Sequence, residues 1–251
     1  MKRDSLLRIA VLSDIHGNLP ALHAVLDDVR RRGADLIVNC GDLLSGPLWP
    51  QQTAALLRAL DWPTISGNHE RQLLACADAP GDAADLYAYA RITASDRAWL
   101  RTLPSTLRPL GDVLMVHGRP HTDLEYLLET VDARGARQAS DDQIDARLAT
   151  LDTLPALLLC GHSHKPRCVQ RAGCCVVNPG SVGLPAFDDS HGGYHVIENA
   201  SPHARYALCE RSQGRWNVAL IAVAYRWEDA AAQAAQCGFD DWARWLRSGR
   251  A

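Results

Sequence analysis

Short apolar runs alternate with amphipathic stretches along the first third of the chain. Runs at 9–12 and 36–40 contain almost only apolar residues, which is typical of buried parallel strands. Between them, apolar residues recur every three or four positions, predicting a helix that begins near Pro20 and ends at Gly33. A helical stretch at 51–60 and a run at 63–66 follow. This β-α-β-α-β order predicts a layered α/β fold.

The remainder of the chain predicts more helices and strands without an internal repeat or a linker. We expect a helical tail over 228–247 with Phe239, Trp242, Trp245 and Leu246 on one side, forming a cap packed on a single domain of residues 1–251. Short helices are expected at 70–77, 84–92 and 95–102, and strands at 113–116, 156–160, 175–177, 194–197 and 216–224.

Composition narrows the class of protein. Of the 251 residues, 47% are apolar, which allows a sizeable core, and the formal net charge of −3 makes nucleic acid an unlikely partner. Without an apolar stretch of about 20 residues or a signal-peptide pattern, we expect no membrane contact and a cytoplasmic location. Eight cysteines without a CxxC pair are interpreted mainly as reduced, buried residues. The oligomeric state is left open.

Polar residues able to bind metals follow the apolar runs. Each motif alone is weak, because a Gly-Asp is usually a turn and a single His is usually a loop or core residue. In open α/β sheets, however, ligands bind at the carboxyl ends of the strands. The five motifs together predict a metal centre, and they read Asp14-Ile15-His16, Gly41-Asp42, Gly67-Asn68-His69-Glu70, Val116-His117-Gly118 and Gly161-His162-Ser163-His164.

These motifs resemble those of the calcineurin-like metallophosphoesterases, over nearly the whole chain. The segments 13–18 and 177–183 and the Trp-rich tail are most similar to the small bacterial and archaeal phosphodiesterase branch, which includes diadenosine-polyphosphate hydrolases. The resemblance implies an α/β fold in which two mixed β-sheets form a sandwich flanked by helices, here with a C-terminal helical cap.

The resemblance also implies a ligand set for two divalent metal ions. One metal would be bound by Asp14, His16, Asp42 and His164, and the other by Asp42, Asn68, His117 and His162, with Asp42 as the bridge. A hydroxide shared by the metals would attack phosphorus in line, and His69 would assist the leaving group. Carboxylate, amide and imidazole ligands make Mn²⁺ the first choice, with Fe, Zn²⁺, Ni²⁺ and Co²⁺ as alternatives.

Several roles near the motifs stay open. Glu70 either orients His69 or caps the following helix. Protein Ser/Thr phosphatases of this superfamily carry Arg residues and an Asp near these motifs, and this sequence lacks them. Their absence disfavours a phosphoprotein substrate and leaves the partner of His69 unknown. Arg119 and His121 are candidates for charge in the pocket, and His191 is a candidate for its mouth. The tryptophans of the tail are core residues or a surface for base stacking.

We therefore predict an enzyme that hydrolyses phosphomonoesters or phosphodiesters, with small substrates such as nucleotides or dinucleoside polyphosphates. Two rival functions remain. The first is a nuclease, which the net charge disfavours, and the second is a scaffold of the same fold without catalysis.

Overall fold

A sandwich of two mixed β-sheets forms the centre of the molecule. The computed structural model describes residues 7–79 and 81–251. The first sheet has the order β13-β12-β1-β2, and only its β1–β2 pair is parallel. Its strands are β1 (Leu7–Leu12), β2 (Leu36–Asn39), β12 (Ala204–Ser212) and β13 (Arg215–Val223).

The second sheet has the order β3-β4-β7-β9-β8, with three parallel central strands and an antiparallel strand at each edge. Its strands are β3 (Thr106–Leu110), β4 (Val113–Val116), β7 (Leu157–Leu159), β8 (Arg167–Arg171) and β9 (Cys174–Asn178). The predicted sandwich of two mixed sheets is therefore confirmed.

Side chains alternate between the two faces of each sheet, and both faces are buried. Ile9 and Val11 pack between the sheets against residues such as Met115, whereas Ala10 and Leu12 belong to the cluster under the helices. Successive strand residues point to opposite faces, so a strand covered on both sides must be apolar at every position. The unbroken apolar run at 9–12 has this explanation.

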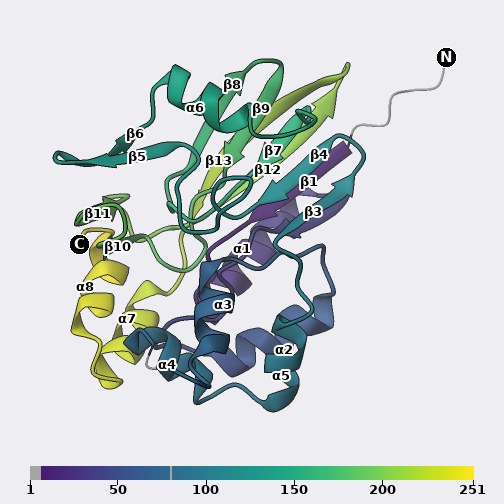
Figure 1. Cartoon of the computed structure of the whole chain (residues 1–251). Coiled ribbons are helices and arrows are strands. Elements are labelled where there is room, and N and C mark those ends of the chain that lie inside the picture. Colours follow the sequence, from purple (N-terminus) through teal and green to yellow (C-terminus); the bar gives the residue numbers. More distant parts are fainter. Residues whose placement is uncertain (1–6, 80) are drawn as a thin grey trace.

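Helices cover both outer faces of the sandwich (Figure 1). The first sheet and the surrounding core contact α1 (Leu19–Arg32), α2 (Pro50–Leu60), α3 (Asn68–Ala75), α4 (Ala83–Tyr89) and α5 (Ala94–Leu100). The second sheet is covered by α6 (Asp141–Leu148). As predicted, Pro20 lies in the first turn of α1 and Gly33, at φ 78°, caps its end.

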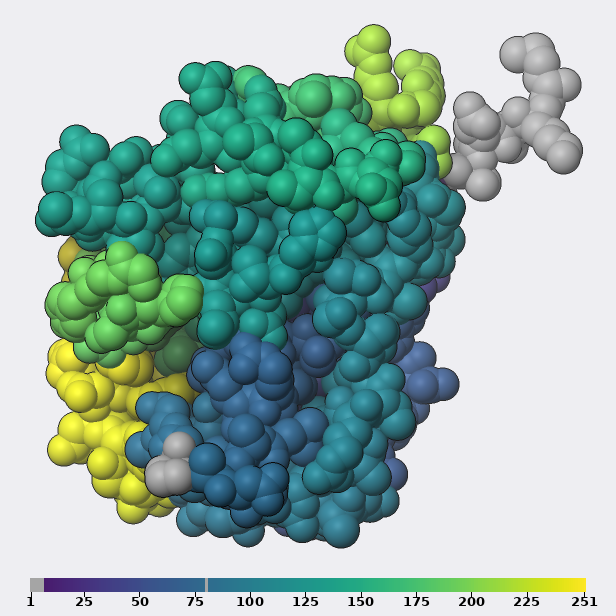
Figure 2. Space-filling model, in the orientation of Figure 1, coloured from purple at the N-terminus to yellow at the C-terminus, as the bar shows by residue number. Residues whose placement is uncertain are grey.

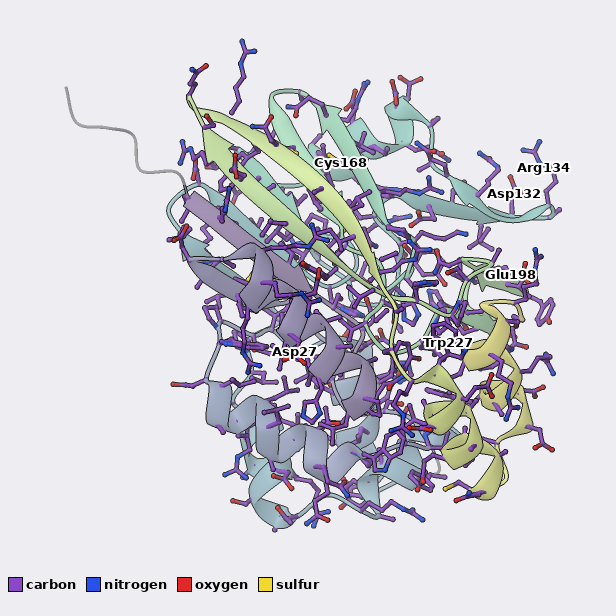
Figure 3. All side chains as sticks on the ribbon, turned by 180° about the vertical axis from the view of Figure 1, so that it is seen from behind. Asp27, Asp132, Arg134, Cys168, Glu198 and Trp227 are labelled. Carbon is purple, nitrogen blue, oxygen red and sulfur yellow. The ribbon has the colours of Figure 1, made fainter. Side chains whose placement is uncertain are left out.

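Two hairpins and the tail complete the fold. The hairpin β5 (Glu129–Asp132) and β6 (Gly135–Gln138) extends from the body, with Asp132 and Arg134 paired at its tip (Figure 3). The hairpin β10 (Ala186–Asp189) and β11 (His195–Glu198) lies against α8 (Asp240–Ser248), the second helix of the tail, as Figure 2 shows for the two segments. The first tail helix, α7 (Trp227–Gln236), packs on α8. The tail packs against the rest of the chain through an apolar cluster that includes Leu48 and Ala186, and α7 also contacts α1.

Two predicted elements differ from the structure. The run 63–66 is wrong as a strand, because Thr64 makes only an isolated bridge to Asn39 before the chain turns away and Ser66 N–H donates to Pro104. The tail is two helices instead of one, since the backbone at Gly238 adopts φ 83°, which favours glycine and ends a helix. Pattern reading also missed β3, β5, β6, β8, β10, β12 and α6.

No helix among residues 7–79 and 81–251 is long and apolar enough to cross a membrane.

Candidate metal centre

The loops after β1 and β2 are joined by backbone hydrogen bonds. Asp14 N–H donates to Gly41 O over 2.9 Å, and His16 N–H donates to Asp42 O over 3.1 Å. Asp14, His16 and Asp42 have φ values of 56°, 52° and 56°, in the left-handed region that non-glycine residues rarely adopt. Such strain concentrates at functional sites, where the surrounding structure holds it in place. These loops turn all three side chains towards the same point.

The second sheet contributes three histidines to that point. His117 follows β4, and His162 and His164 follow β7 with φ values of 67° and 53°. His162 N–H donates to Asp14 Oδ1 over 3.2 Å, which connects the two sheets directly. Gly161 permits this approach, because a Cβ there would lie 2.0 Å from Ser13 Oγ. The strands whose ends meet here thus belong to both sheets, and not to one edge of a single sheet.

Asp14, His16 and His164 form a first group of buried ligand atoms, all within 4.8 Å of one another. The Nδ1 atoms of His16 and His164 lie 2.9 and 2.7 Å from the carbonyls of Ser45 and Leu184. A carbonyl can only accept, so Nδ1 carries the proton and Nε2 keeps its lone pair when the ring is neutral. The two Nε2 atoms nevertheless lie 3.2 Å apart. Two lone pairs at this distance repel unless a cation lies near both.

Asp42, His117 and His162 form a second group with the same 4.8 Å limit. His117 Nδ1 lies 2.7 Å from Cys40 O, and its Nε2 lies 3.0 Å from both Asp42 Oδ2 and Asn68 Oδ1. Burial lowers the pKa of His117, but the negative charge of Asp42 outweighs this effect and raises it to about 9. A positive charge is therefore favoured between these three side chains.

Unpartnered atoms show that the residues present fit a pair of cations. Asp14 Oδ2 and His162 Nε2 are buried and make no hydrogen bond to the described residues. Buried polar atoms are nearly always satisfied, so each one requires an explanation. Burial lowers the pKa of His16 to about 3 and that of His162 to about 4, which keeps both rings in the neutral form that binds metals. All seven predicted ligand side chains, including Asn68, meet here.

Glu70 caps the helix and does not orient His69. Its buried carboxylate accepts N–H groups of Asp42, Leu43 and Gly67, each over 2.8 Å. Burial and the negative charge of Asp42 raise the pKa of Glu70 to about 7. One carboxylate therefore ties the loop after β2 to the start of α3.

His69 has a partner that pattern reading missed. Its Nδ1 lies 3.0 Å from Oδ1 of Asp85, a side chain only 2% exposed, while the backbone N–H of His69 donates to Asp42 Oδ1 over 3.0 Å. Asp85 lies on the buried face of α4 together with Ala88, three residues later. A carboxylate on an apolar helix face was the signal that could have revealed it.

A cavity of about 380 Å³ opens over the centre. Trp242 and Trp245 line it while being at most 9% exposed, so these tryptophans are both core residues and cavity wall. His191 also lines the cavity, as the sequence suggested. Arg119 and His121, the candidates for charge in the pocket, line other surface pockets, where Arg119 pairs with Glu125 and His121 contacts Thr150 O.

Comparison with known proteins agrees with this geometry. Residues 7–201 match the model of the calcineurin-like phosphoesterase superfamily domain. An uncharacterized protein of Methanocaldococcus jannaschii is 28% identical over 215 residues, which cover 76% of this chain and 82% of that protein.

Two solved structures share the architecture. A metallophosphoesterase from Sphaerobacter thermophilus is 26% identical with a TM-score of 0.77, and the match covers 98% of this chain and 100% of that one. A hypothetical protein from Pyrococcus horikoshii OT3 has a TM-score of 0.75 over 97% of this chain and 98% of that one. At 18% identity, this second likeness shows the fold alone.

Proposed function

The chain belongs to the calcineurin-like phosphoesterase superfamily and is a phosphoric ester hydrolase, and on this premise we propose that two divalent cations bind side by side in its centre. Asp14, His16 and His164 would hold one cation, and Asn68, His117 and His162 the other, with Asp42 shared. The observation that carries the proposal is the pair of ligand groups, each within 4.8 Å, with unpartnered atoms in both. We propose Mn²⁺ first, since oxygen ligands contribute to both groups.

The protein residues supply orientation and proton transfer. Two bound cations would neutralise charge on the phosphoryl oxygens and lower the pKa of water at the site. The carbonyls of Ser45, Cys40 and Leu184 fix three imidazole rings so that Nε2 faces the centre, an arrangement that raises ligand basicity.

His69 lies at the edge of the same centre, with its ring 5.3 Å from that of His16, and it lines the cavity. We propose that His69 gives a proton to the leaving oxygen. Asp85 would act as a positioning residue, because its carboxylate accepts from Nδ1–H and leaves Nε2 free to face the substrate.

We propose phosphomonoesters or phosphodiesters of nucleotides as the substrate class. Support comes from the cavity of about 380 Å³ with an aromatic wall, which suits a small organic ester better than a protein or a nucleic-acid backbone.

The test measures hydrolysis of p-nitrophenyl phosphate and bis-p-nitrophenyl phosphate by protein loaded with Mn²⁺. We expect turnover of at least one ester, and a loss of about a thousandfold or more in Asp42→Asn together with a fall in bound metal. Asp142→Asn, which changes an exposed carboxylate on α6, is the matched control and should keep full activity.

Three outcomes contradict the proposal. Equal activity in the two variants would remove Asp42 from the centre. Bound metal without turnover of either ester would favour the scaffold. Preferential cleavage of oligonucleotides that weakens steeply with salt would favour the nuclease.

A further inference from the structure

One wall of the cavity is apolar and aromatic, and it touches the first ligand group. The Phe187 ring lies 4.6 Å from that of His164, and the Trp242 ring lies 6.0 Å from that of His16, both edge to face. Leu184 and Trp245 extend the same wall. An organic group that extends along this wall from a phosphate at the centre would therefore lie next to flat apolar side chains, which favour aromatic rings.

The rim of the cavity carries negative charge. Asp82, Asp188 and Asp189 line it, and none of the described lining residues is a lysine or an arginine. The three carboxylates accept hydrogen bonds from neutral donors only: Ala84 N–H to Asp82, Tyr194 O–H to Asp188, and two N–H groups to Asp189. No cationic partner of these three carboxylates occurs within ion-pair distance among the described residues. Their charge is exposed to the ligand.

These carboxylates and the cavity size limit the substrate. Each additional phosphate of a polyphosphate chain would face the carboxylates without a compensating lysine or arginine. Two unit charges about 7 Å apart repel enough, even in a water-like dielectric, to weaken binding about threefold per pair. An ionised carboxylate accepts hydrogen bonds only, so it selects hydroxyl or amino donors instead. The volume of about 380 Å³ is near the lower end of the ~300–1,000 Å³ typical of small-molecule sites.

From these observations we propose that the substrate is a phosphodiester with a single phosphate and one nucleoside, and that the cavity discriminates against polyphosphates. The heteroaromatic base packs on the wall of Phe187 and Trp242, and a sugar hydroxyl donates to Asp188 or Asp189. Dinucleoside polyphosphates, which the sequence analysis named beside nucleotides, are disfavoured by both charge and volume. This inference rests on the proposed function, since it concerns the same centre.

The test compares three esters that share the p-nitrophenolate leaving group. Thymidine 5′-(p-nitrophenyl phosphate) carries a nucleoside and one phosphate, methyl p-nitrophenyl phosphate lacks the nucleoside, and the γ-p-nitrophenyl ester of thymidine triphosphate adds two phosphates. Stacking of a base on an aromatic side chain is worth about five- to hundredfold in binding. We expect kcat/KM for the thymidine diester to exceed that of the methyl ester by about tenfold or more, and that of the triphosphate ester by about tenfold.

Two variants assign the selectivity to residues. Phe187→Leu keeps an apolar side chain but removes a ring, and should reduce the advantage of thymidine over methyl. The double variant Asp188→Asn, Asp189→Asn should improve the triphosphate ester about fivefold relative to the thymidine diester. Asp142→Asn is the control and should change neither ratio, because α6 lies on the far side of the second sheet.

The failures are distinguishable. If none of the three esters is hydrolysed by metal-loaded protein, the proposed function fails. If the methyl and thymidine esters react equally well, or the triphosphate ester reacts as fast as the thymidine diester, the proposed hydrolase function holds. The proposal of a nucleoside substrate with a single phosphate is then overturned. Unchanged ratios in both variants would also overturn it.

Discussion

Replacing Glu70 by Gln tests whether one buried carboxylate holds the metal-binding loops in place. Glu70 is 1% exposed, and its two oxygens accept three backbone N–H groups, each over 2.8 Å. Oε2 receives those of Asp42 and Gly67, and Oε1 receives that of Leu43. Glutamine has the same shape but only one acceptor oxygen, so its NH₂ group must face at least one of these donors.

The best amide orientation keeps two of the three bonds and leaves Leu43 N–H without an acceptor. Leaving a buried donor unsatisfied costs about 1–3 kcal/mol. Above the pKa of Glu70, about 7, the other two bonds also weaken because the acceptor is no longer charged. We expect Glu70→Gln to reduce the free energy of unfolding by about 2–4 kcal/mol. Because the Asp42 N–H is among the three donors, the loop after β2 should loosen, and bound metal should fall.

Urea unfolding of metal-loaded protein measures the first quantity, and elemental analysis after dialysis measures the second. The control is Glu228→Gln, an exposed partner of Arg247 that should change stability by less than about 0.5 kcal/mol. If both variants unfold at the same urea concentration and retain equal metal, the three hydrogen bonds do not stabilise the centre, and the reasoning from capping is refuted.

Three further predictions follow from particular contacts. Asp85→Asn should lower kcat about ten- to hundredfold for esters with alkoxide leaving groups and much less for p-nitrophenyl esters, because the partner of His69 Nδ1 then loses its negative charge; equal losses would contradict the role in proton donation. Burial raises the pKa of Asp28, but hydrogen bonds from Arg32, Tyr206 and Arg31 outweigh it and lower the pKa. The ionised Asp28 should therefore stabilise the fold above the unfolded-state pKa of about 4, and this stabilisation should be lost as pH falls through the lower pKa of the folded state. The free energies of unfolding of wild type and Asp28→Asn, followed by circular dichroism, should converge as the pH is lowered. Chelation by EDTA should lower the thermal midpoint and re-addition of Mn²⁺ should restore it, because repulsion between the buried lone pairs returns; an unchanged midpoint would exclude stabilising metal binding.

The amino-acid sequence by itself determined the strands of the sandwich core and the side chains that end them. The apolar runs at β1, β2, β4 and β7 can be read locally, because a strand covered on both faces is apolar at nearly every position. The metal-competent motifs can be read as well, because each directly follows its strand. Likewise Pro20 and Gly33 fixed the ends of α1, since their backbone preferences act within one residue.

Only the tertiary structure decided which distant groups meet. Asp85 reaches His69 through the packing of α4. Phe187 and Trp242 reach the centre through β10 and α8, although more than a hundred residues separate these two from the first motif. The strand β12 mixes buried apolar residues with half-buried polar ones such as Arg205 and Glu210, so it gave no clear apolar run. The local periodicity of apolar residues shows which side chains of a segment are buried. Which side chains it buries against depends on the packing of the whole chain, and this packing determines the partner of His69 and the walls of the cavity.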